Sequence, residues 1–163
     1  EEILGKNIAL VRVMPNLAAK VGAACTALCK NEKASKLQLE IAQEIFASIG
    51  TTHVIEEKLF SAFTALSGSS GAITLMYINA MATIGVNAGF TKDTALLIAN
   101  EAVMGSSKLL SETGNRLMEL QDAICSPAGT TIAGVMAAKK LGLESIILQS
   151  IQAIIDKDIA MAK

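Results

Sequence analysis

The apolar residues at the start of the chain follow a strand, helix, strand order. Asn7–Asn16 is a short run of β-branched and apolar residues closed by Pro15, which predicts a buried strand entering a loop. Leu17–Asn31 contains a second strand-like run. Lys33–Ile49 repeats apolar residues at helical spacing, and Thr51–Ile55 is strand-like again. This order is typical of a unit of parallel β-sheet with its connecting helix.

The predicted helix at Lys33–Ile49 has a dry side, a wet side and signals at both ends. Its polar residues, Gln43 among them, mark the side that faces water. Asn31 is expected to cap the first turn of this helix, and Gly50 is expected to end the helix. The apolar positions that define its dry side are Leu37, Ile41, Ile45 and Ile49, with Leu39, Ala42 and Phe46 widening it.

After Lys58 the pattern becomes helical throughout. Leu59–Thr91 contains no charged residue, but Ser67–Gly71 interrupts it, and a membrane span needs about twenty mostly apolar residues without such breaks. We therefore expect helices inside a soluble assembly rather than a membrane span. Further helices are expected at Thr91–Ser111, Asn115–Ile124, Thr131–Leu141 and Glu144–Ala162.

Helices this apolar, in a chain of 163 residues, have too little surface of their own to cover one another. A second copy of the chain is the natural cover. We therefore expect a homodimer or a higher homo-oligomer, formed through helices that include Ile73–Val86 and Ala95–Leu110.

Composition narrows the partners and chemistry. A net charge of −1, 3% aromatic residues and no Trp leave neither a basic surface nor a stacking platform for nucleic acid. Cysteines without paired spacing predict neither disulfides nor a metal site, but buried free thiols in a reducing, cytoplasmic compartment. His53 lacks a placed partner for general-base catalysis. The chain begins at Glu1 without a basic and apolar leader, which indicates a cut chain rather than a secreted one.

The stretch Cys125–Val135, read as CSPAGTTIAGV, is the strongest candidate for binding chemistry. Pro127 predicts a turn, in which Gly129 is free to take a positive φ, and Thr130 or Thr131 is expected to cap the helix that follows. A helix that starts after such a turn presents unpaired N–H groups and the positive end of its dipole, which suit a carboxylate or phosphate. The alternative is that the stretch only separates two helices.

Several motifs, in this order and spacing, resemble the C-terminal part of the pyrroline-5-carboxylate reductase family. The motifs are VRVMPN at Val11–Asn16, ALSGSSGA at Ala65–Ala72, NAGF at Asn87–Phe90, GSSKLL at Gly105–Leu110 and SPAGTTIAG at Ser126–Gly134. The resemblance implies reduction of a cyclic imine to proline with NADPH or NADH, on a homo-oligomer with interleaved C-terminal helices. The family's N-terminal dinucleotide-binding domain, with its glycine-rich turn, has no counterpart in this sequence. A fragment without that turn is expected to be inactive alone.

The resemblance also implies the fold and the site. The fold is a short remnant of a Rossmann-like α/β sheet in residues 1–57, followed by an all-helical dimerisation and substrate-binding domain in residues 58–163. Thr131 is the candidate catalytic residue, because its hydroxyl faces the ring nitrogen in the family. The substrate-binding residues implied are Ser67, Gly68, Ser69, Gly129, Thr130 and Thr131. The cofactor-binding residues implied are Asn16, Ser70 and Gly71.

The chain departs from the family's motifs at three places. Ser70-Gly71 stands where the family has Gly-Pro, which replaces a rigid wall with a more flexible one, and Leu17-Ala18 follows Asn16 in place of Thr-Pro. Ala128 replaces a glycine, a change that is tolerable if its φ is negative. Two other readings therefore remain: a reductase of another small substrate, and a helical oligomerisation module without catalytic duty.

Overall fold

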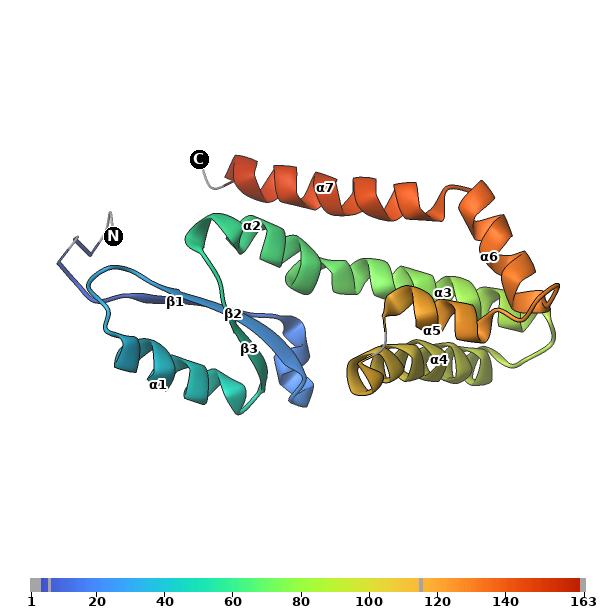
Figure 1. Ribbon diagram of the computed structural model, residues 1–163, viewed down its shortest axis with the longest axis horizontal. Coiled ribbons are helices and arrows are strands. Elements are labelled where there is room, and N and C mark those ends of the chain that lie inside the picture. The colour runs from blue at the N-terminus through green and yellow to red at the C-terminus, as the bar shows by residue number, and fades with distance from the viewer. Residues whose placement is uncertain (1–3, 6, 115, 162–163) are drawn as a thin grey trace. The chain divides into compact units, whose positions relative to one another are not determined.

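The computed structural model describes residues 4–5, 7–114 and 116–161. The strands are β1 (Val11–Pro15), β2 (Ala24–Lys30) and β3 (Gly50–Val54), and short 3-10 helices lie at Leu17–Val21 and Glu57–Leu59. The helices are α1 (Lys36–Ala47), α2 (Phe60–Phe63), α3 (Ser70–Asn87), α4 (Lys92–Thr113), α5 (Leu117–Ile124), α6 (Thr130–Lys140) and α7 (Leu143–Met161), with a π-helical segment, Thr64–Ser69, between α2 and α3 (Figure 1).

The chain divides into two compact units. We call Glu1–Gly71 with Ile151–Lys163 the sheet unit, and Ala72–Ser150 the helical unit. The fold confirms a small α/β sheet followed by helices. The predicted helix ends at Asn115 and Ala162 lie outside the described residues. The predicted boundary between residues 57 and 58 stays a prediction about domains.

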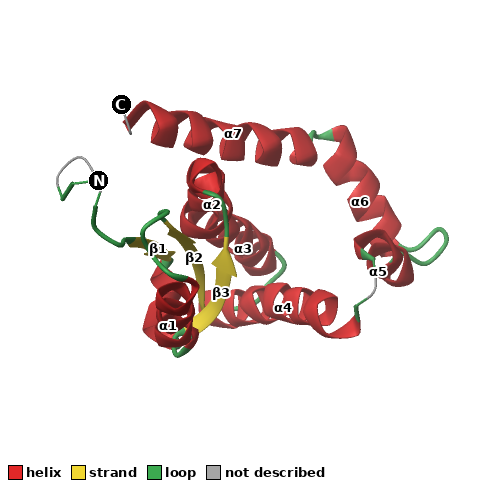
Figure 2. Cartoon of the chain, turned by 60° about the vertical axis from the view of Figure 1, so that its left-hand side comes forward, coloured by secondary structure: helices red, strands yellow, loops and turns green. Residues whose placement is uncertain are grey.

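The sheet has the order β1-β2-β3, and α1 connects and packs against its parallel pair (Figure 2). β2 and β3 are parallel with Ala24 opposite Gly50, which confirms the parallel unit. β1 is antiparallel to β2, with Val11 opposite Lys30. The prediction of a buried strand is wrong for β1, where every residue is half-buried or exposed. β1 hydrogen-bonds to β2 alone among the described strands, so it lies at an edge of this sheet.

The ends of α1 differ from the prediction. Its N-cap is Ser35, not Asn31: the Ser35 hydroxyl accepts from Gln38 N–H at 3.2 Å, and the Gln38 side chain accepts from Ser35 N–H at 2.8 Å. This reciprocal capping box satisfies two free donors at once. Asn31 instead accepts from Leu10 N–H at 3.1 Å and ties two loops together. Gly50 does not end the helix but begins β3.

The predicted dry side of α1 is only partly covered. Leu37, Ile41 and Ile45 are exposed, whereas Leu39, Ala42 and Phe46, at the edge of the predicted stripe, are half-buried. Gln43, expected on the wet side, is half-buried too, so the covered side of the helix is rotated from the centre of the stripe. An apolar stripe on α1 is therefore left without cover in this chain.

One face of the sheet is joined to the start of the helices by a cluster of side chains. Arg12 forms an ion pair with Glu57 and lies 4.2 Å from the centre of the Phe60 ring. Cys29 Sγ donates to Glu57 Oε2 at 2.9 Å. Partial burial, and then the hydrogen bond to Glu57, raise the pKa of Cys29 to about 11. The thiols are free as predicted, but Cys25, Cys29 and Cys125 are half-buried rather than buried.

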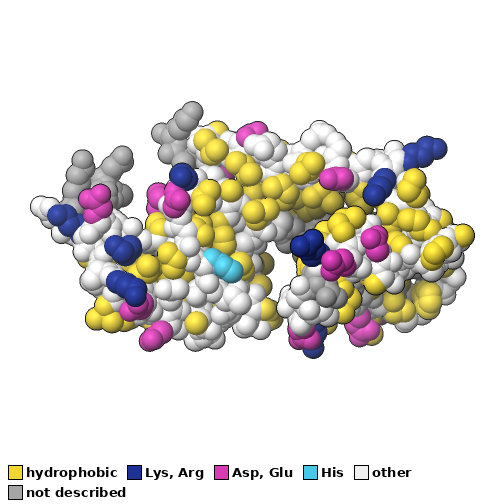
Figure 3. All heavy atoms as spheres, viewed as in Figure 1, with side chains coloured by type: hydrophobic (Ala, Val, Ile, Leu, Met, Phe, Trp, Pro, Cys, Tyr) yellow, Lys and Arg dark blue, Asp and Glu magenta, His cyan; other side chains and the backbone are white. Residues whose placement is uncertain are grey.

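The helical unit has a small core made mainly of alanine. Ile78 and Ala82 of α3 meet Ala95 and Ala99 of α4, and a Cβ on Gly85 would lie 3.0 Å from the Ala95 Cβ. These small side chains allow close helix packing but bury little apolar area. Many large apolar side chains stay exposed, and Figure 3 shows hydrophobic side chains spread over the surface.

Among the described residues, one helical stretch, Glu57–Asn87, is long and apolar enough to cross a membrane by length and composition. Only 11% of its most apolar window is buried inside the chain. The same test is passed by helices that are covered by protein, and the stretch contains the π-helical turn with Ser67–Ser69. The function of the protein must therefore account for this large exposed apolar surface.

Candidate functional site

The SGSSG motif, Ser67–Gly71, lies inside a continuous helical stretch. Ser67, Gly68 and Ser69 belong to the π-helical segment Thr64–Ser69, and Ser70 begins α3. The Thr64 hydroxyl donates to Phe60 O at 2.9 Å and the Ser70 hydroxyl donates to Leu66 O at 2.6 Å. Hydroxyls at both ends of the segment thus bond to backbone carbonyls where the helix changes its winding. Such π-helical turns occur frequently at functional sites.

Asn16 and Ser67, predicted from separate motifs, are in direct contact. Asn16 Nδ2 donates to Ser67 O at 3.1 Å and lies 3.2 Å from Ser67 Oγ. Asn16 Oδ1 accepts from the Cys25 N–H at 3.2 Å, and the Ser67 hydroxyl donates to Cys25 O at 3.3 Å. We call these three residues the Asn16 clamp. It fixes the π-helical segment to the start of β2.

The SPAGTT motif forms a tight turn before α6. Gly129 N–H donates to Ser126 O at 3.0 Å, so Ser126–Gly129 is a hydrogen-bonded four-residue turn with Pro127 in its second position. Ala128, in the third position, has a φ of 56°, and Gly129 has a φ of −80°. The positive φ is therefore at Ala128 and not, as predicted, at Gly129. A type II turn with Pro in its second position requires a positive φ in its third.

Ala128 is expected to be tolerated in place of glycine if its φ is negative, but its φ is positive. An alanine in the left-handed region is strained by about 1 kcal/mol relative to the right-handed one, because its Cβ approaches the following carbonyl oxygen. Gly129 leaves room for the Ser126 side chain. A Cβ on Gly129 would collide with Ser126 Oγ and lie 3.1 Å from Ser126 O, so a larger residue would force the Ser126 side chain to move.

The first turn of α6 has no side-chain cap. The N-cap is Gly129, so the predicted capping roles of Thr130 and Thr131 are wrong; they are the first two residues of the helix. Thr130 is exposed and Thr131 is half-buried. Because no side chain caps this turn, its backbone N–H groups are available to an anion, and the helix dipole favours one.

The predicted site residues fall into two groups. Asn16 and Ser67–Gly71 lie in the sheet unit, and Gly129–Thr131 lie in the helical unit. Within the first group the Asn16 side chain is fully engaged with its neighbours, and the Ser70 hydroxyl bonds to its own helix. Gly71 is exposed, and a Cβ there would meet nothing within 4 Å. Each group is shaped within its own unit.

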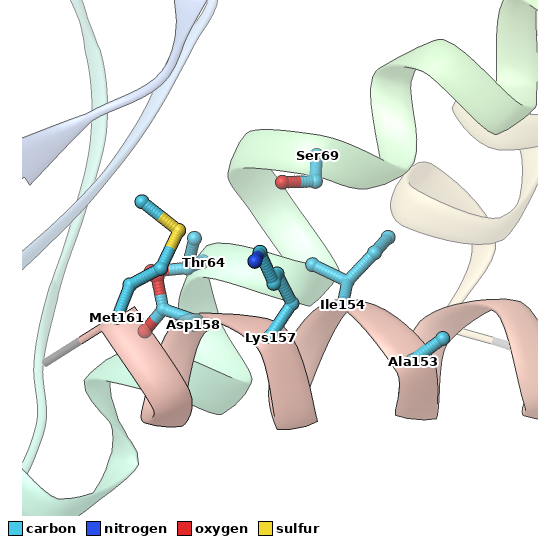
Figure 4. A pocket seen from close by; sticks show the side chains of 7 residues that line it. All are labelled: Thr64, Ser69, Ala153, Ile154, Lys157, Asp158 and Met161. Atoms are coloured by element: carbon cyan, nitrogen blue, oxygen red, sulfur yellow. The ribbon is translucent and has the colours of Figure 1, made fainter. Parts of the chain in front are cut away.

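A pocket of 410 Å³ in the sheet unit includes Ser69 (Figure 4). Lys157 and Ile154 project from α7 toward the helical turn that carries Ser69. Sequence reasoning missed Lys157 and Asp158 here, because nothing in their local pattern indicates that α7 returns to the π-helical segment. The lining residues are Thr64, Ser69, Ala153, Ile154, Lys157, Asp158 and Met161.

The part of the chain that the structure describes contains no cluster of side chains suited to bind a metal ion. No group of three or more His, Cys, Asp or Glu side chains there could hold a metal ion. His53 is exposed on β3. The predicted site residues themselves carry backbone amides, hydroxyls and the side-chain amide of Asn16.

The helical part of the chain matches one protein-family model. The model is described as pyrroline-5-carboxylate reductase dimerisation, and it matches residues 57–161. The chain belongs to the pyrroline-5-carboxylate reductase family. This confirms the recognition that the SGSSG and SPAGTT motifs suggested.

Relatives and solved structures agree with this placement. The chain is 42% identical to the pyrroline-5-carboxylate reductase of Aquifex aeolicus over 93% of this chain and 57% of that protein. For the Escherichia coli reductase the identity is 33%, over 98% of this chain and 60% of that protein. The chain therefore spans somewhat more than half the length of the curated relatives that it matches.

Two solved reductases share its fold. The Streptococcus pyogenes enzyme has a TM-score of 0.89 and 39% identity, over 94% of this chain and 59% of that chain. The Plasmodium falciparum enzyme, solved with NADP bound, has a TM-score of 0.93 and 26% identity, over 99% of this chain and 65% of that chain. The small sheet followed by helices is thus the fold of the matched part of pyrroline-5-carboxylate reductases.

Proposed function

We propose that the chain is the substrate-binding and oligomerisation part of a pyrroline-5-carboxylate reductase. The reaction is reduction of the cyclic imine 1-pyrroline-5-carboxylate to L-proline with NADPH or NADH, in cytoplasmic proline biosynthesis. Family membership supports the reaction class. The observation that carries the site is the SPAGTT turn, which opens α6 without a side-chain cap and so leaves backbone donors for the carboxylate of the substrate.

In this proposal the start of α6 contacts the substrate at two places, its carboxylate and its ring nitrogen. The N–H groups of Thr130 and Thr131 bind and orient the substrate carboxylate, while the Gly129 N–H holds the turn closed on Ser126 O. The Thr131 hydroxyl donates a hydrogen bond to the ring nitrogen, whose charge and protonation change during reduction. Thr131 lies at the second helical position and is half-buried, and its hydroxyl is not used as a cap. That hydroxyl is therefore free to act on a bound substrate.

The nicotinamide cofactor, which supplies the hydride when bound, fits this chain only in part. The sequence has no G-x-G-x-x-G turn to hold a pyrophosphate. Among the predicted cofactor residues, Asn16 and Ser70 are already hydrogen-bonded within the chain, and Gly71 alone presents an open position. We therefore expect the isolated chain to be inactive.

The proposed assembly is a homodimer or higher homo-oligomer. Leu75, Met76 and Ile84 of α3 are 67%, 72% and 64% exposed, which is more apolar surface than a helix in water normally shows. The matched family model is a dimerisation model and includes all of α3 and α4. We propose that a second copy covers these helices, rather than a membrane or a nucleic acid. Residues 1–57 and 58–163 are the proposed domains.

Two alternatives remain. The exposed apolar helices favour an oligomerisation module in which the SPAGTT turn has no catalytic duty. The strained Ala128 and the Ser70-Gly71 pair favour a reductase of another small substrate, because both stand where the family's motifs have other residues.

A chimera tests the proposal. In it, this chain replaces the stretch of the Aquifex aeolicus reductase that it matches, so that the rest of that enzyme supplies the cofactor site. We expect proline formation that depends on the substrate and on NADPH or NADH, and none from the isolated chain. Activity with other small substrates alone would favour the divergent reductase. A folded, oligomeric and inactive chimera would reject the catalytic proposal and favour the oligomerisation module.

A further inference from the structure

The Asn16 clamp closes a ring of hydrogen bonds between three segments that are far apart in the sequence. The ladder between β1 and β2 ends with Pro15 opposite Thr26, so the next pair in register is Asn16 and Cys25. There the backbone of Asn16 leaves the ladder, because its carbonyl accepts from Ala19 N–H at 3.1 Å. The Asn16 side chain takes its place and accepts the Cys25 N–H at 3.2 Å.

The other half of the Asn16 amide holds Ser67. Asn16 Nδ2 donates toward both oxygens of Ser67, at 3.1 Å for the carbonyl and 3.2 Å for the hydroxyl. The Ser67 hydroxyl donates its hydrogen bond to Cys25 O at 3.3 Å. Its oxygen can therefore accept a further hydrogen bond, but it has no proton left to donate to a ligand.

We infer that Asn16 is a positioning residue, which sets the π-helical SGSSG turn through Ser67, and is not itself a cofactor ligand. The inference rests on the proposed function for what the turn does, but the clamp is a property of this chain alone. A π-helical turn is less favourable than the α-helix on either side of it, so it needs an external anchor. The clamp provides that anchor, half-buried at the start of β2.

Substitutions at Asn16 separate positioning from cofactor binding. Asn16→Asp keeps the acceptor for Cys25 N–H and loses both donors to Ser67, whereas Asn16→Ala loses everything. In the chimera we expect both variants to lower kcat about tenfold to a hundredfold, with the KM for NADPH within about twofold, because a displaced turn misplaces the reacting groups. Ser67→Ala should cost less, and adding it to Asn16→Asp should cost little more, since both act through one contact.

Asn31→Ala is the matched control. Asn31 also bonds through its side-chain amide to backbone, with Leu10 N–H at 3.1 Å and Ile8 O at 2.9 Å, at the opposite end of β2. We expect it to lower the melting temperature and leave kcat unchanged. A rise in the KM for NADPH, with normal kcat, in both Asn16 variants would overturn the inference and make Asn16 a cofactor ligand.

Hydrogen exchange gives a readout that does not depend on activity. Amides of residues 64–71 should exchange at least about tenfold faster in Asn16→Asp than in Asn31→Ala or the unsubstituted chimera, because the turn has lost its anchor. Unchanged exchange there would overturn the inference whatever the kinetics show. If the unsubstituted chimera is folded but inactive and this difference is seen, the proposed function fails and the clamp stands.

Discussion

The sheet unit and the helical unit are stabilised in different ways. In the sheet unit, polar side chains bridge distant segments: Asn16 joins β2 to the π-helical turn, and Arg12 joins β1 to Glu57 and Phe60. In the helical unit the buried core is Ile78 and three alanines, and large apolar side chains remain outside. A unit with directional contacts can define its own geometry, whereas one that exposes its apolar area depends on a partner to bury it.

The largest effect is expected in the helical unit, at Thr131. Thr131→Ala in the chimera should lower kcat about a hundredfold to ten-thousandfold, because it removes a hydrogen bond to the ring nitrogen. Thr131→Ser keeps the hydroxyl and should retain much of the activity. The melting temperature should barely change, since Gly129 and not Thr131 is the N-cap. Steady-state kinetics of both variants is the measurement, and a wild-type kcat for the alanine variant would remove Thr131 from the catalytic site.

The dependence of the helical unit on a partner is tested at Leu75. Leu75→Asp places a charge on an apolar surface that is 67% exposed in the single chain. If a second copy covers it, the dissociation constant should rise about a thousandfold, which corresponds to about 4 kcal/mol for an uncompensated buried charge. Analytical ultracentrifugation of the chimera measures it.

Val21→Asp is the control, because Val21 is 80% exposed but lies in the sheet unit, outside the helices proposed to form the interface. The oligomer should be unaffected. Equal sedimentation of the Leu75 variant and the unsubstituted protein would show that this part of α3 is not at the interface.

The close packing of the sheet unit is tested at Gly50. Its φ is 152°, and a Cβ there would collide with the backbone of Ala24 on the neighbouring strand. Gly50→Ala should therefore cost about 3 kcal/mol or more of unfolding free energy, from backbone strain and overpacking together. Gly22→Ala separates the two causes: Gly22 also has a positive φ, of 70°, but open space around it. Denaturant unfolding should show a much smaller loss for Gly22→Ala.

The thiol of Cys29 reports on the polar contacts of the sheet unit. Because its pKa is raised to about 11 from 9.0, its thiolate fraction near pH 8 should be about a hundredfold below that of an ordinary thiol. Alkylation rates against pH, in a variant with Cys25 and Cys125 replaced by Ser, measure this. Glu57→Gln should bring the pKa part of the way back, since partial burial is the larger cause and the Glu57 contact the next.

The raised pKa of Cys29 also determines how the stability of the fold changes with pH. The folded pKa of Cys29 lies above the ordinary value, so the protonated thiol stabilises the fold fully below about pH 9, and this contribution is lost as pH rises through about 11. The pKa of Glu57 is lowered, mainly by the hydrogen bond from Cys29, so its contribution is lost as pH falls. A stability profile that rises between pH 9 and 11 would contradict the contact.

The smallest effect is expected at Ala128. Ala128→Gly removes the strain of a φ of 56° but adds freedom to the unfolded chain, so the net gain should be at most about 1 kcal/mol. Ala133→Gly, at an exposed helical position in α6, is the control and should lose about 1 kcal/mol. Thermal unfolding compares them. A loss at both positions would mean that Ala128 is not strained in solution.

The order of the elements and the family can both be read from the amino-acid sequence. Apolar periodicity identifies β2, α1, β3 and the helices from α4 onward, because local spacing records which side of an element is apolar. The motifs identify the family, because Pro, Gly and hydroxyl residues at fixed offsets are unusual without a shared backbone shape.

The tertiary structure decided which faces are buried and what each site residue does. The stripe of Leu37, Ile41 and Ile45 is exposed although its spacing is helical, because burial depends on what lies opposite. The positive φ falls on Ala128 and not Gly129, because the hydrogen bond from Gly129 to Ser126 fixes the turn type. Asn16 contacts Ser67, 51 residues away, because the π-helical segment returns to the start of β2. Local sequence carries no record of such a return, and so no periodicity could have predicted the clamp.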